Sequence, residues 1–183
     1  MLDDQRDPPP LPAPTSGAGA RLVVFGWGND ARGDDGLGPL LLERVARTDW
    51  PEVRAIEDFQ LQIEHALDLD GADLALFLDA GRDTPAPIAF VEIEPKRGAA
   101  HTTHALAPEA VLDVYERALG KAAPPAFTLC VRGEQFELGQ GLSPEASERL
   151  ERAWSFVKAL MRDRTLAAWR RAANACRGDA TAG

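Results

Sequence analysis

Residues 21–39 (RLVVFGWGNDARGDDGLGP) constrain the fold more than any other part of this sequence. They begin with an unbroken apolar run at 22–25, which is typical of a strand buried on both faces of a sheet. A glycine-rich turn follows and ends in two adjacent carboxylates, Asp34 and Asp35, ahead of a helical pattern at 36–47. Such a unit opens an α/β sheet, and these sheets place their sites at the carboxyl ends of their strands.

The rest of the sequence alternates strands with helices. Strand patterns occupy residues 52–57, 74–78, 88–93 and 127–131, and helical patterns occupy 61–69, 108–119 and a long stretch after Ser143. Ser143-Pro144-Glu145 supplies an N-cap serine, a first-turn proline and a first-turn acid. The pattern leaves open whether this last helix continues through Trp169. The alternation predicts a three-layer α/β/α sandwich with a mostly parallel, twisted sheet of about five strands.

Length and composition indicate one cytoplasmic domain. A chain of 183 residues is of single-domain size. We expect residues 21–175 to form this domain, between a disordered leader at 1–20 and a flexible tail at 176–183. The leader is rich in proline and glycine and has no apolar core of the signal-peptide kind. No stretch approaches the roughly 18 apolar residues of a membrane helix.

Charge and cysteine content narrow the function classes. The net charge is −9, from 20 basic and 29 acidic residues, which disfavours binding to nucleic acid or to anionic membranes. The two cysteines, Cys130 and Cys176, have neither redox-motif nor zinc-ligand spacing, and Cys130 lies in an apolar run that suits a buried thiol. The sequence does not determine the oligomeric state, and a monomer is our expectation.

Two simpler interpretations of this segment compete with a catalytic or metal-binding role for Asp34 and Asp35. Either carboxylate could simply stabilise the amino terminus of the following helix, which is worth about 0.3–1 kcal/mol. The glycines could instead begin a dinucleotide-binding turn, because Gly26-Trp27-Gly28 matches the start of G-x-G-x-x-G. Position 31 is alanine, however, and an acidic pair would repel a pyrophosphate, so the match to this motif is weak.

A second acidic residue follows another buried strand. Asp79 ends the apolar run at 74–78, and the carboxyl ends of parallel strands meet at one sheet edge, within a strand spacing or two of each other. Two carboxylates with an imidazole make a nitrogen–oxygen site for a divalent metal such as nickel, zinc or iron. The candidate imidazoles are His65 in a short helix and His101 and His104 in the loop before residue 108. Each residue alone has a structural explanation, and only their convergence points to chemistry.

Together these motifs resemble the nickel-iron hydrogenase maturation proteases. The family's first motif, G-x-G-N-x-x-x-x-D-D/E-G-x-G, is present as Gly26-Trp27-Gly28-Asn29 and Asp34-Asp35-Gly36-Leu37-Gly38. Its second, an apolar strand that ends in Asp-Ala, matches Leu76-Phe77-Leu78-Asp79-Ala80, and its third, Ser/Thr-x-His, matches Thr102-Thr103-His104. Order and spacing agree over residues 21–160, so the resemblance covers the whole domain.

The resemblance implies an endopeptidase that acts in hydrogenase assembly. Such enzymes remove a C-terminal extension from the hydrogenase large-subunit precursor after nickel has been inserted. The implied partner is therefore the nickel-loaded precursor, and the nickel arrives with the substrate and is not held permanently. The matching nickel ligands are Asp35, Asp79 and His104, with Asp35 and Asp79 as the catalytic candidates for aspartic-type or metal-assisted hydrolysis.

The sequence departs from the family pattern in two places. Many members carry glutamate at the position of Asp35, and many have an Asp-Gly-Gly-Thr-like turn after the second strand. Here residues 58–65 read DFQLQIEH, which resembles the subgroup that serves cytoplasmic, NAD-reducing hydrogenases. Asp58 aligns with the acid of the missing turn, and both a site role and a structural role are open to it.

Two other functions are compatible with the same residues. A metal-dependent hydrolase of another substrate would hold its own metal tightly. A non-catalytic hydrogenase assembly chaperone would bind the precursor and release no peptide. The sequence contains no G-x-S-x-G elbow and no H-E-x-x-H helix that would indicate a different class of hydrolase.

Overall fold

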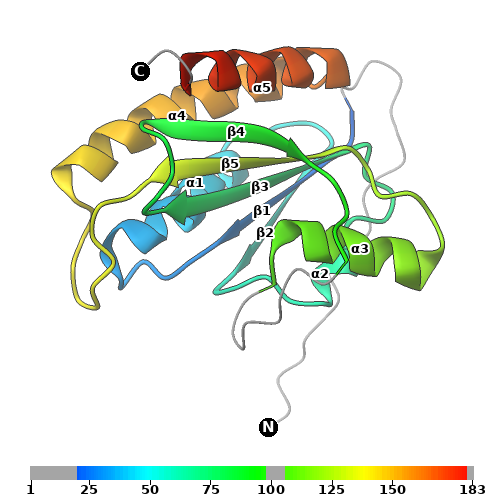
Figure 1. Cartoon of the computed structure of the whole chain (residues 1–183), viewed down its shortest axis with the longest axis horizontal. Helices are drawn as coiled ribbons and strands as arrows, with labels where there is room; N and C mark the ends of the chain where they lie inside the picture. Colours follow the sequence, from blue (N-terminus) through cyan, green and yellow to red (C-terminus); the bar gives the residue numbers. More distant parts are fainter. Residues whose placement is uncertain (1–19, 98–105, 181–183) are drawn as a thin grey trace, which may run out of the picture.

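A five-stranded sheet lies between two layers of helices (Figure 1). The computed structural model describes residues 20–97 and 106–180, with side chains to residue 177. The strands are β1 (Leu22–Trp27), β2 (Val53–Asp58), β3 (Leu74–Gly81), β4 (Ile88–Ile93) and β5 (Ala126–Arg132). The helices are η1 (Gly33–Gly36), α1 (Leu37–Ala46), α2 (His65–Asp68), α3 (Pro108–Leu119), α4 (Pro144–Arg162) and α5 (Leu166–Ala180). The predicted α/β class is confirmed.

The strand order is β2-β1-β3-β5-β4, and four of the five strands are parallel. β4 runs antiparallel to β5 because the connection at 82–87 is too short for a helical crossover, so the chain reverses direction after β3. β1 and β3 are direct neighbours at the centre of the sheet. The turn after β1 and the end of β3 therefore lie one strand spacing apart.

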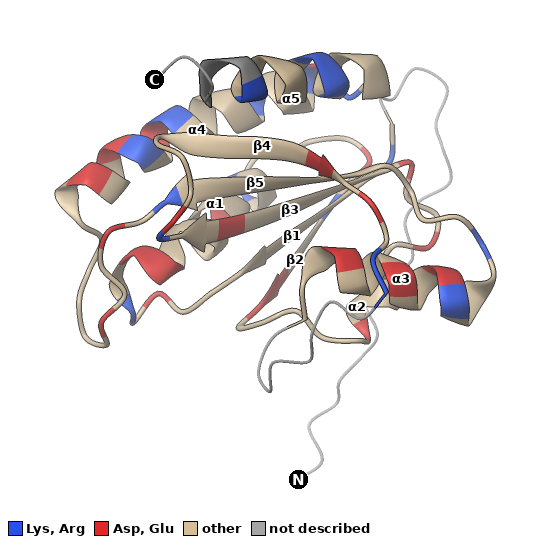
Figure 2. Ribbon diagram, viewed as in Figure 1, with Lys and Arg blue, Asp and Glu red and all other residues tan. Residues whose placement is uncertain are grey.

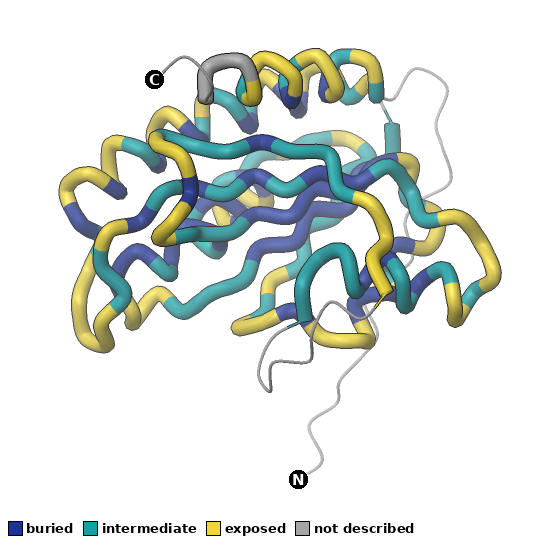
Figure 3. The backbone as a smooth tube through the Cα atoms, viewed as in Figure 1, coloured by how far each residue is buried: buried dark blue, intermediate teal, exposed yellow. Residues whose placement is uncertain are grey.

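Strand side chains alternate between two apolar cores. In β1, Leu22 and Val24 pack with α1, α4 and α5, whereas Val23 and Phe25 pack on the opposite face with α2 and α3. The strands β1, β3 and β5 are the most deeply buried elements (Figure 3), and most charged residues lie on the helices and loops around the sheet (Figure 2). Within the described ranges, no helix combines the length and the apolar character needed to cross a membrane.

The connection after β2 contains less helix than the sequence predicts. A helix was expected over residues 61–69, but α2 covers only His65–Asp68. The reason is local, because the backbone N–H of Gln62 donates to Nδ1 of His65 (2.9 Å) and the N–H of Ala66 bonds the carbonyl of Ile63. A side chain and short turns thus replace the first helical hydrogen bonds.

The C-terminal region forms two helices, α4 and α5. As the sequence indicates, the hydroxyl of Ser143 caps α4 by accepting from the N–H of Ala146 (3.1 Å). α4 ends at Arg162, and the side chain of Asp163 accepts from the backbone N–H of Thr165 (3.2 Å) and from its hydroxyl (2.8 Å). This turn redirects the chain into α5.

α5 extends the folded domain beyond the expected boundary at residue 175. It runs to Ala180 because four of its residues at helical spacing pack against the core: Leu166, Trp169, Ala173 and Cys176. Trp169 is fully buried between Phe90 and Phe127, and its indole N–H donates to the carbonyls of Leu160 and Asp163. The expected leader at 1–20 lies almost entirely outside the described residues.

Trp169→Ala will destabilise the protein by about 3–5 kcal/mol, because it opens a cavity under α5. Urea unfolding followed by circular dichroism measures this change. The control is Leu138→Ala, because Leu138 is 76% exposed and its truncation is expected to change stability by less than about 0.5 kcal/mol. A loss below 1 kcal/mol for Trp169→Ala would mean that α5 does not seal the core.

Candidate functional site

Two glycines allow the turn after β1 to pack closely against the sheet. Gly28 has φ +140°, and a Cβ on it would lie 2.1 Å from the carbonyl oxygen of Asp35. A Cβ on Gly38 would lie 2.6 Å from the carbonyl oxygen of Trp27 and 2.8 Å from that of Leu78. Side chains at these positions would force the backbone apart. The start of α1 is thereby held against the carboxyl ends of β1 and β3, where the predicted site residues lie.

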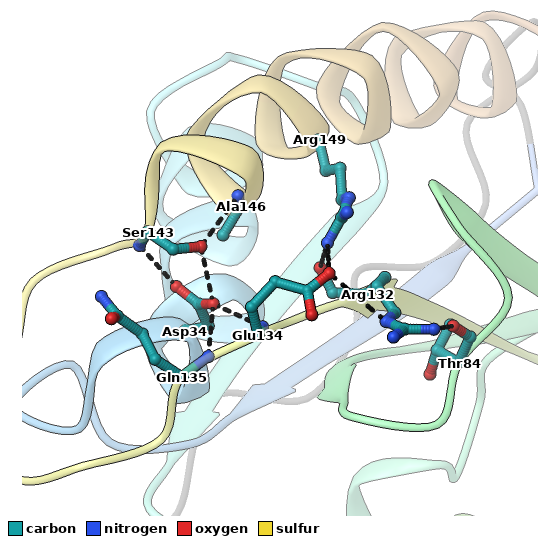
Figure 4. A network of polar contacts seen from close by, with 8 residues as sticks. All are labelled: Asp34, Thr84, Arg132, Glu134, Gln135, Ser143, Ala146 and Arg149. Carbon is teal, nitrogen blue, oxygen red and sulfur yellow. Dashed lines mark hydrogen bonds and ion pairs between the residues drawn. The ribbon is translucent and has the colours of Figure 1, made fainter.

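Asp34 is fully buried and accepts four hydrogen bonds (Figure 4). The donors are the backbone N–H groups of Glu134 (2.6 Å), Gln135 (3.0 Å) and Ser143 (2.7 Å) and the hydroxyl of Ser143 (2.8 Å). Burial alone would raise the pKa of Asp34, but these hydrogen bonds outweigh it and lower the pKa below its ordinary value. Asp34 is therefore an ionised structural group, and its complete burial keeps it out of reach of a substrate.

The loop after β5, which donates hydrogen bonds to Asp34, also forms polar contacts with α4, β5 and the loop after β3. Glu134 accepts from Arg149 of α4 (2.6 Å) and lies 3.5 Å from Arg132 at the end of β5. Arg132 in turn donates to the carbonyl of Thr84 after β3 (3.3 Å). Figure 4 shows these contacts running from the turn that contains Asp34, across the start of α4, to the loop after β3. One polar network thus fixes the segments around the site.

Asp35 has a different environment from its neighbour. It is partly buried, and its carboxylate accepts only from the backbone N–H of Asn29 (3.0 Å) among the described residues. Most of its acceptor capacity is therefore free for a proton, a water or a metal ion. The sequence analysis could not separate Asp34 from Asp35, because the donors to Asp34 come mainly from the backbone of a distant loop.

Asp79 stands at the end of β3 on the same strand face as Phe77, which packs with the α2–α3 layer. Its carboxylate accepts from the N–H of Ala80 (2.7 Å). Burial raises the pKa of Asp79 to about 7, the hydrogen bond from Ala80 opposes the rise, and the negative charge of Asp35 adds to it. The two carboxylates are thus close enough to interact, and near neutral pH Asp79 exchanges its proton readily.

The side chain next to Asp79 across the sheet is Cys130. The two residues are register partners on β3 and β5, and the hydroxyl of Thr84 lies 2.9 Å from the sulfur of Cys130. Burial raises the pKa of Cys130 to about 11, even though the contact with Thr84 lowers it. Cys130 therefore remains a neutral thiol at neutral pH and is not an activated nucleophile.

The third predicted ligand, His104, lies outside the described residues, as does His101. The described chain resumes at Leu106, whose N–H donates to the carbonyl of Leu61 (3.3 Å). Leu106 packs in the same core as Phe77, on the face where Asp79 stands. The ligand roles of Asp35, Asp79 and His104 stay predictions. Within the described residues, no three histidine, cysteine or acidic side chains form a metal-binding group.

His65 and Asp58 have structural contacts. His65 is buried and lies edge-on to Phe25, and its Nε2 is 3.5 Å from a carboxylate oxygen of Asp58. Asp58 also accepts from the N–H of Phe59 (2.6 Å) and from the side chain of Gln62 (2.9 Å). These contacts hold the connection between β2 and α2 in place.

Comparison with solved structures identifies the same fold in hydrogenase maturation proteases. HycI, a [NiFe] hydrogenase maturation protease from Thermococcus kodakarensis, is 24% identical, with a TM-score of 0.63 over 80% of this chain and 96% of that one. The hydrogenase maturating endopeptidase HybD from E. coli is 22% identical, with a TM-score of 0.59 over 78% and 92%. A hydrogenase 2 maturation peptidase from a Thaumarchaeota archaeon is 23% identical, with a TM-score of 0.54 over 76% and 97%.

These identities are low, so the likeness establishes a shared fold, which is the fold that the sequence resemblance implied. No protein-family profile matches the sequence, and no curated protein is significantly similar to it.

The adjacent aspartates will differ in how much stability the protein loses when each is replaced by asparagine. Asp34→Asn sets an amide N–H₂ against buried donors and removes charge-assisted hydrogen bonds, so we expect a loss of about 2–4 kcal/mol in unfolding free energy. Asp35→Asn, the matched control, will change it by less than about 1 kcal/mol. Chemical denaturation of both variants measures the difference. Equal losses would contradict the assignment of Asp34 as the structural member of the pair.

Asp79→Asn will stabilise the protein more at pH 8 than at pH 5. The folded pKa of about 7 lies above the unfolded value near 3.8, so the folded state binds more protons between these values. Stability from this group therefore falls as pH rises through that window, by up to about 1.4 kcal/mol per pH unit, and the asparagine variant escapes the loss. Thermal unfolding with a chelator present at several pH values measures the effect.

Asp70→Asn is the control for this pH series. The hydrogen bond from Lys121 lowers the pKa of Asp70, so this group is ionised in both folded and unfolded states between pH 5 and 8. The difference between Asp70→Asn and the wild type should stay constant over that range. A constant difference for Asp79→Asn as well would show that the pKa of Asp79 is not raised.

Proposed function

We propose that this protein is an endopeptidase that removes the C-terminal extension of a nickel-iron hydrogenase large-subunit precursor. The observation that carries the proposal is the pairing of Asp35 with Asp79 at the carboxyl end of the central strands. This pairing occurs in a fold shared with solved hydrogenase maturation proteases. The motifs that include these aspartates are also the ones in which the sequence resembles that family.

The substrate's own nickel is the recognition element in this proposal. Asp35 offers a carboxylate with free acceptor capacity, and Asp79 gives up its proton when a cation approaches. His104 would supply an imidazole as the third ligand. Two oxygens and one nitrogen are a suitable donor set for nickel, and they leave further positions open for the precursor's ligands.

Hydrolysis requires a base that activates water and an acid that protonates the leaving amine. Asp79 loses its proton when it binds nickel, whereas Asp35 accepts a single hydrogen bond and keeps most of its acceptor capacity. We assign to Asp35 the removal of a proton from the attacking water and its delivery to the leaving amine, and to Asp79 the role of the ionised ligand that holds the nickel. The substrate's nickel would polarise the scissile carbonyl as a Lewis acid.

The partner and the compartment follow from the same reasoning. We place the reaction in the cytoplasm, where hydrogenase large subunits receive their nickel before assembly. Residues 58–65 resemble those of the subgroup that serves NAD-reducing hydrogenases, so a precursor of that kind is the first substrate to test. Asp58 contributes to the shape of this region through its contacts with Gln62 and His65.

Incubation with a nickel-loaded large-subunit precursor will release a C-terminal peptide, and a nickel-free precursor will stay intact. Intact-protein mass spectrometry measures both reactions. Asp35→Asn, Asp79→Asn and His104→Ala should each lower the cleavage rate by at least about 100-fold, because each removes a group used by the reaction. Folding of each variant is checked by circular dichroism.

The two alternative functions give different results in this experiment. A chaperone would bind the nickel-loaded precursor but would release no peptide from either the loaded or the nickel-free form. A metal-dependent hydrolase of another substrate would retain stoichiometric metal after purification, which elemental analysis detects. Cleavage that is equally fast without nickel would contradict recognition through the substrate's metal.

A further inference from the structure

A groove of about 860 Å³ lies beside the Asp35 turn. Its walls come from three segments: the turn after β1, the first two turns of α1 and the end of β2. Gly28, whose backbone packs directly against the carbonyl of Asp35, is one of its lining residues. A chain bound in this groove would therefore lie next to the candidate site.

The groove is acidic. Four carboxylates line it, from Asp30, Glu43, Glu57 and Asp58, and no described residue that lines it is basic. Glu43 pairs with Arg47 outside the groove, and Asp58 is used by its local hydrogen bonds. Asp30 and Glu57 are exposed, and their carboxylates have no hydrogen bond or ion pair with the described part of the chain. Red marks the end of β2, where Glu57 and Asp58 lie, in Figure 2.

Exposed apolar side chains continue from the groove. Phe59, which lines it, is 75% exposed, and Ile63 and Leu67 in the same connection are 57% and 62% exposed. They are three of the four large exposed hydrophobic residues in the described ranges. Ile63 and Leu67 are four residues apart in a helical turn and so lie on one side of it. Exposed apolar residues gathered in one short segment are typical of a protein-binding surface.

We propose that this groove binds a cationic segment of the substrate polypeptide next to the scissile bond. The inference rests on the proposed function, because it assumes that a peptide bond is cleaved at Asp35 and Asp79. Lysine or arginine side chains of the segment pair with Asp30 and Glu57, and an apolar neighbour packs on Phe59. The net charge of −9 attracts such a segment from a distance and favours its capture over that of acidic chains.

Binding is tested first with peptides, so that catalysis is not involved. Fluorescence anisotropy at low salt compares a fluorescein-labelled GAKLKAG peptide with its acidic counterpart GAELEAG, using the full chain. The lysine peptide should bind at least about tenfold more tightly and should lose affinity as salt increases. Equal binding of the two peptides, or no detectable binding of either, would overturn the proposal.

The groove is located with two charge-matched double variants. Asp30→Asn with Glu57→Gln should weaken binding of the lysine peptide about five- to twentyfold, since two exposed charge contacts are lost. Glu145→Gln with Glu148→Gln, which neutralises two exposed carboxylates on α4, should leave it within about twofold of the wild type. The same loss in both double variants would show an effect of net charge and would exclude the groove.

Precursor cleavage separates this proposal from the proposed function. The groove variant should raise KM for the nickel-loaded precursor about tenfold with a much smaller effect on kcat, whereas Asp35→Asn abolishes kcat. Groove-dependent peptide binding without precursor cleavage would support the groove and refute the peptidase. Cleavage with the same KM in the groove variant would refute the groove and support the peptidase.

Discussion

The buried carboxylate of Asp34 and its four hydrogen bonds hold together the parts of the molecule that surround the site. A charge in this position is stable only when donors replace the water that it has lost. Those donors come from the loop after β5 and from the residue that caps α4. The side chain of Asp34 thereby holds three segments together: the turn that contains Asp35, the loop after β5 and the start of α4.

The environments of Asp34 and Asp79 show how the same side chain acquires opposite properties. Both carboxylates lie at the carboxyl end of the sheet and both are strongly desolvated. Asp34 has four donors, and its pKa falls below the ordinary value, whereas Asp79 has one donor and the nearby charge of Asp35, and its pKa rises to about 7. The number of donors separates a structural anion from a group that exchanges protons near neutrality.

Much of the fold could be predicted because strand and helix periodicity is local information. Apolar runs and alternating patterns identified all five strands, and the rule that parallel strands end at one edge placed Asp79 beside the turn of Asp35. The pairing of β4 with β5 could not be predicted, because it depends on contacts between segments that are distant in the sequence. The short length of α2 could not be predicted from the sequence either, because the side chain of His65 replaces a helical carbonyl as the acceptor for the N–H of Gln62.

The candidate site could be predicted only in part, because contacts between distant segments also decide the roles of its residues. The two carboxylates belong to recognisable motifs, but backbone groups about 100 residues away decide which of Asp34 and Asp35 is structural. The acidic groove could not be predicted, because the pairing of β1 with β2 brings residues 57–59 beside the turn after β1.

The distance along the chain between Asp34 and Ser143 also sets the order in which the protein can mature during synthesis. The first strand and helix leave the ribosome early, but the donors that stabilise the buried carboxylate are made more than a hundred residues later. Until residues 134–143 have emerged, the carboxylate of Asp34 lacks all four of these hydrogen bonds. The turn that contains Asp35 is thus completed only after all five strands of the sheet have been synthesised.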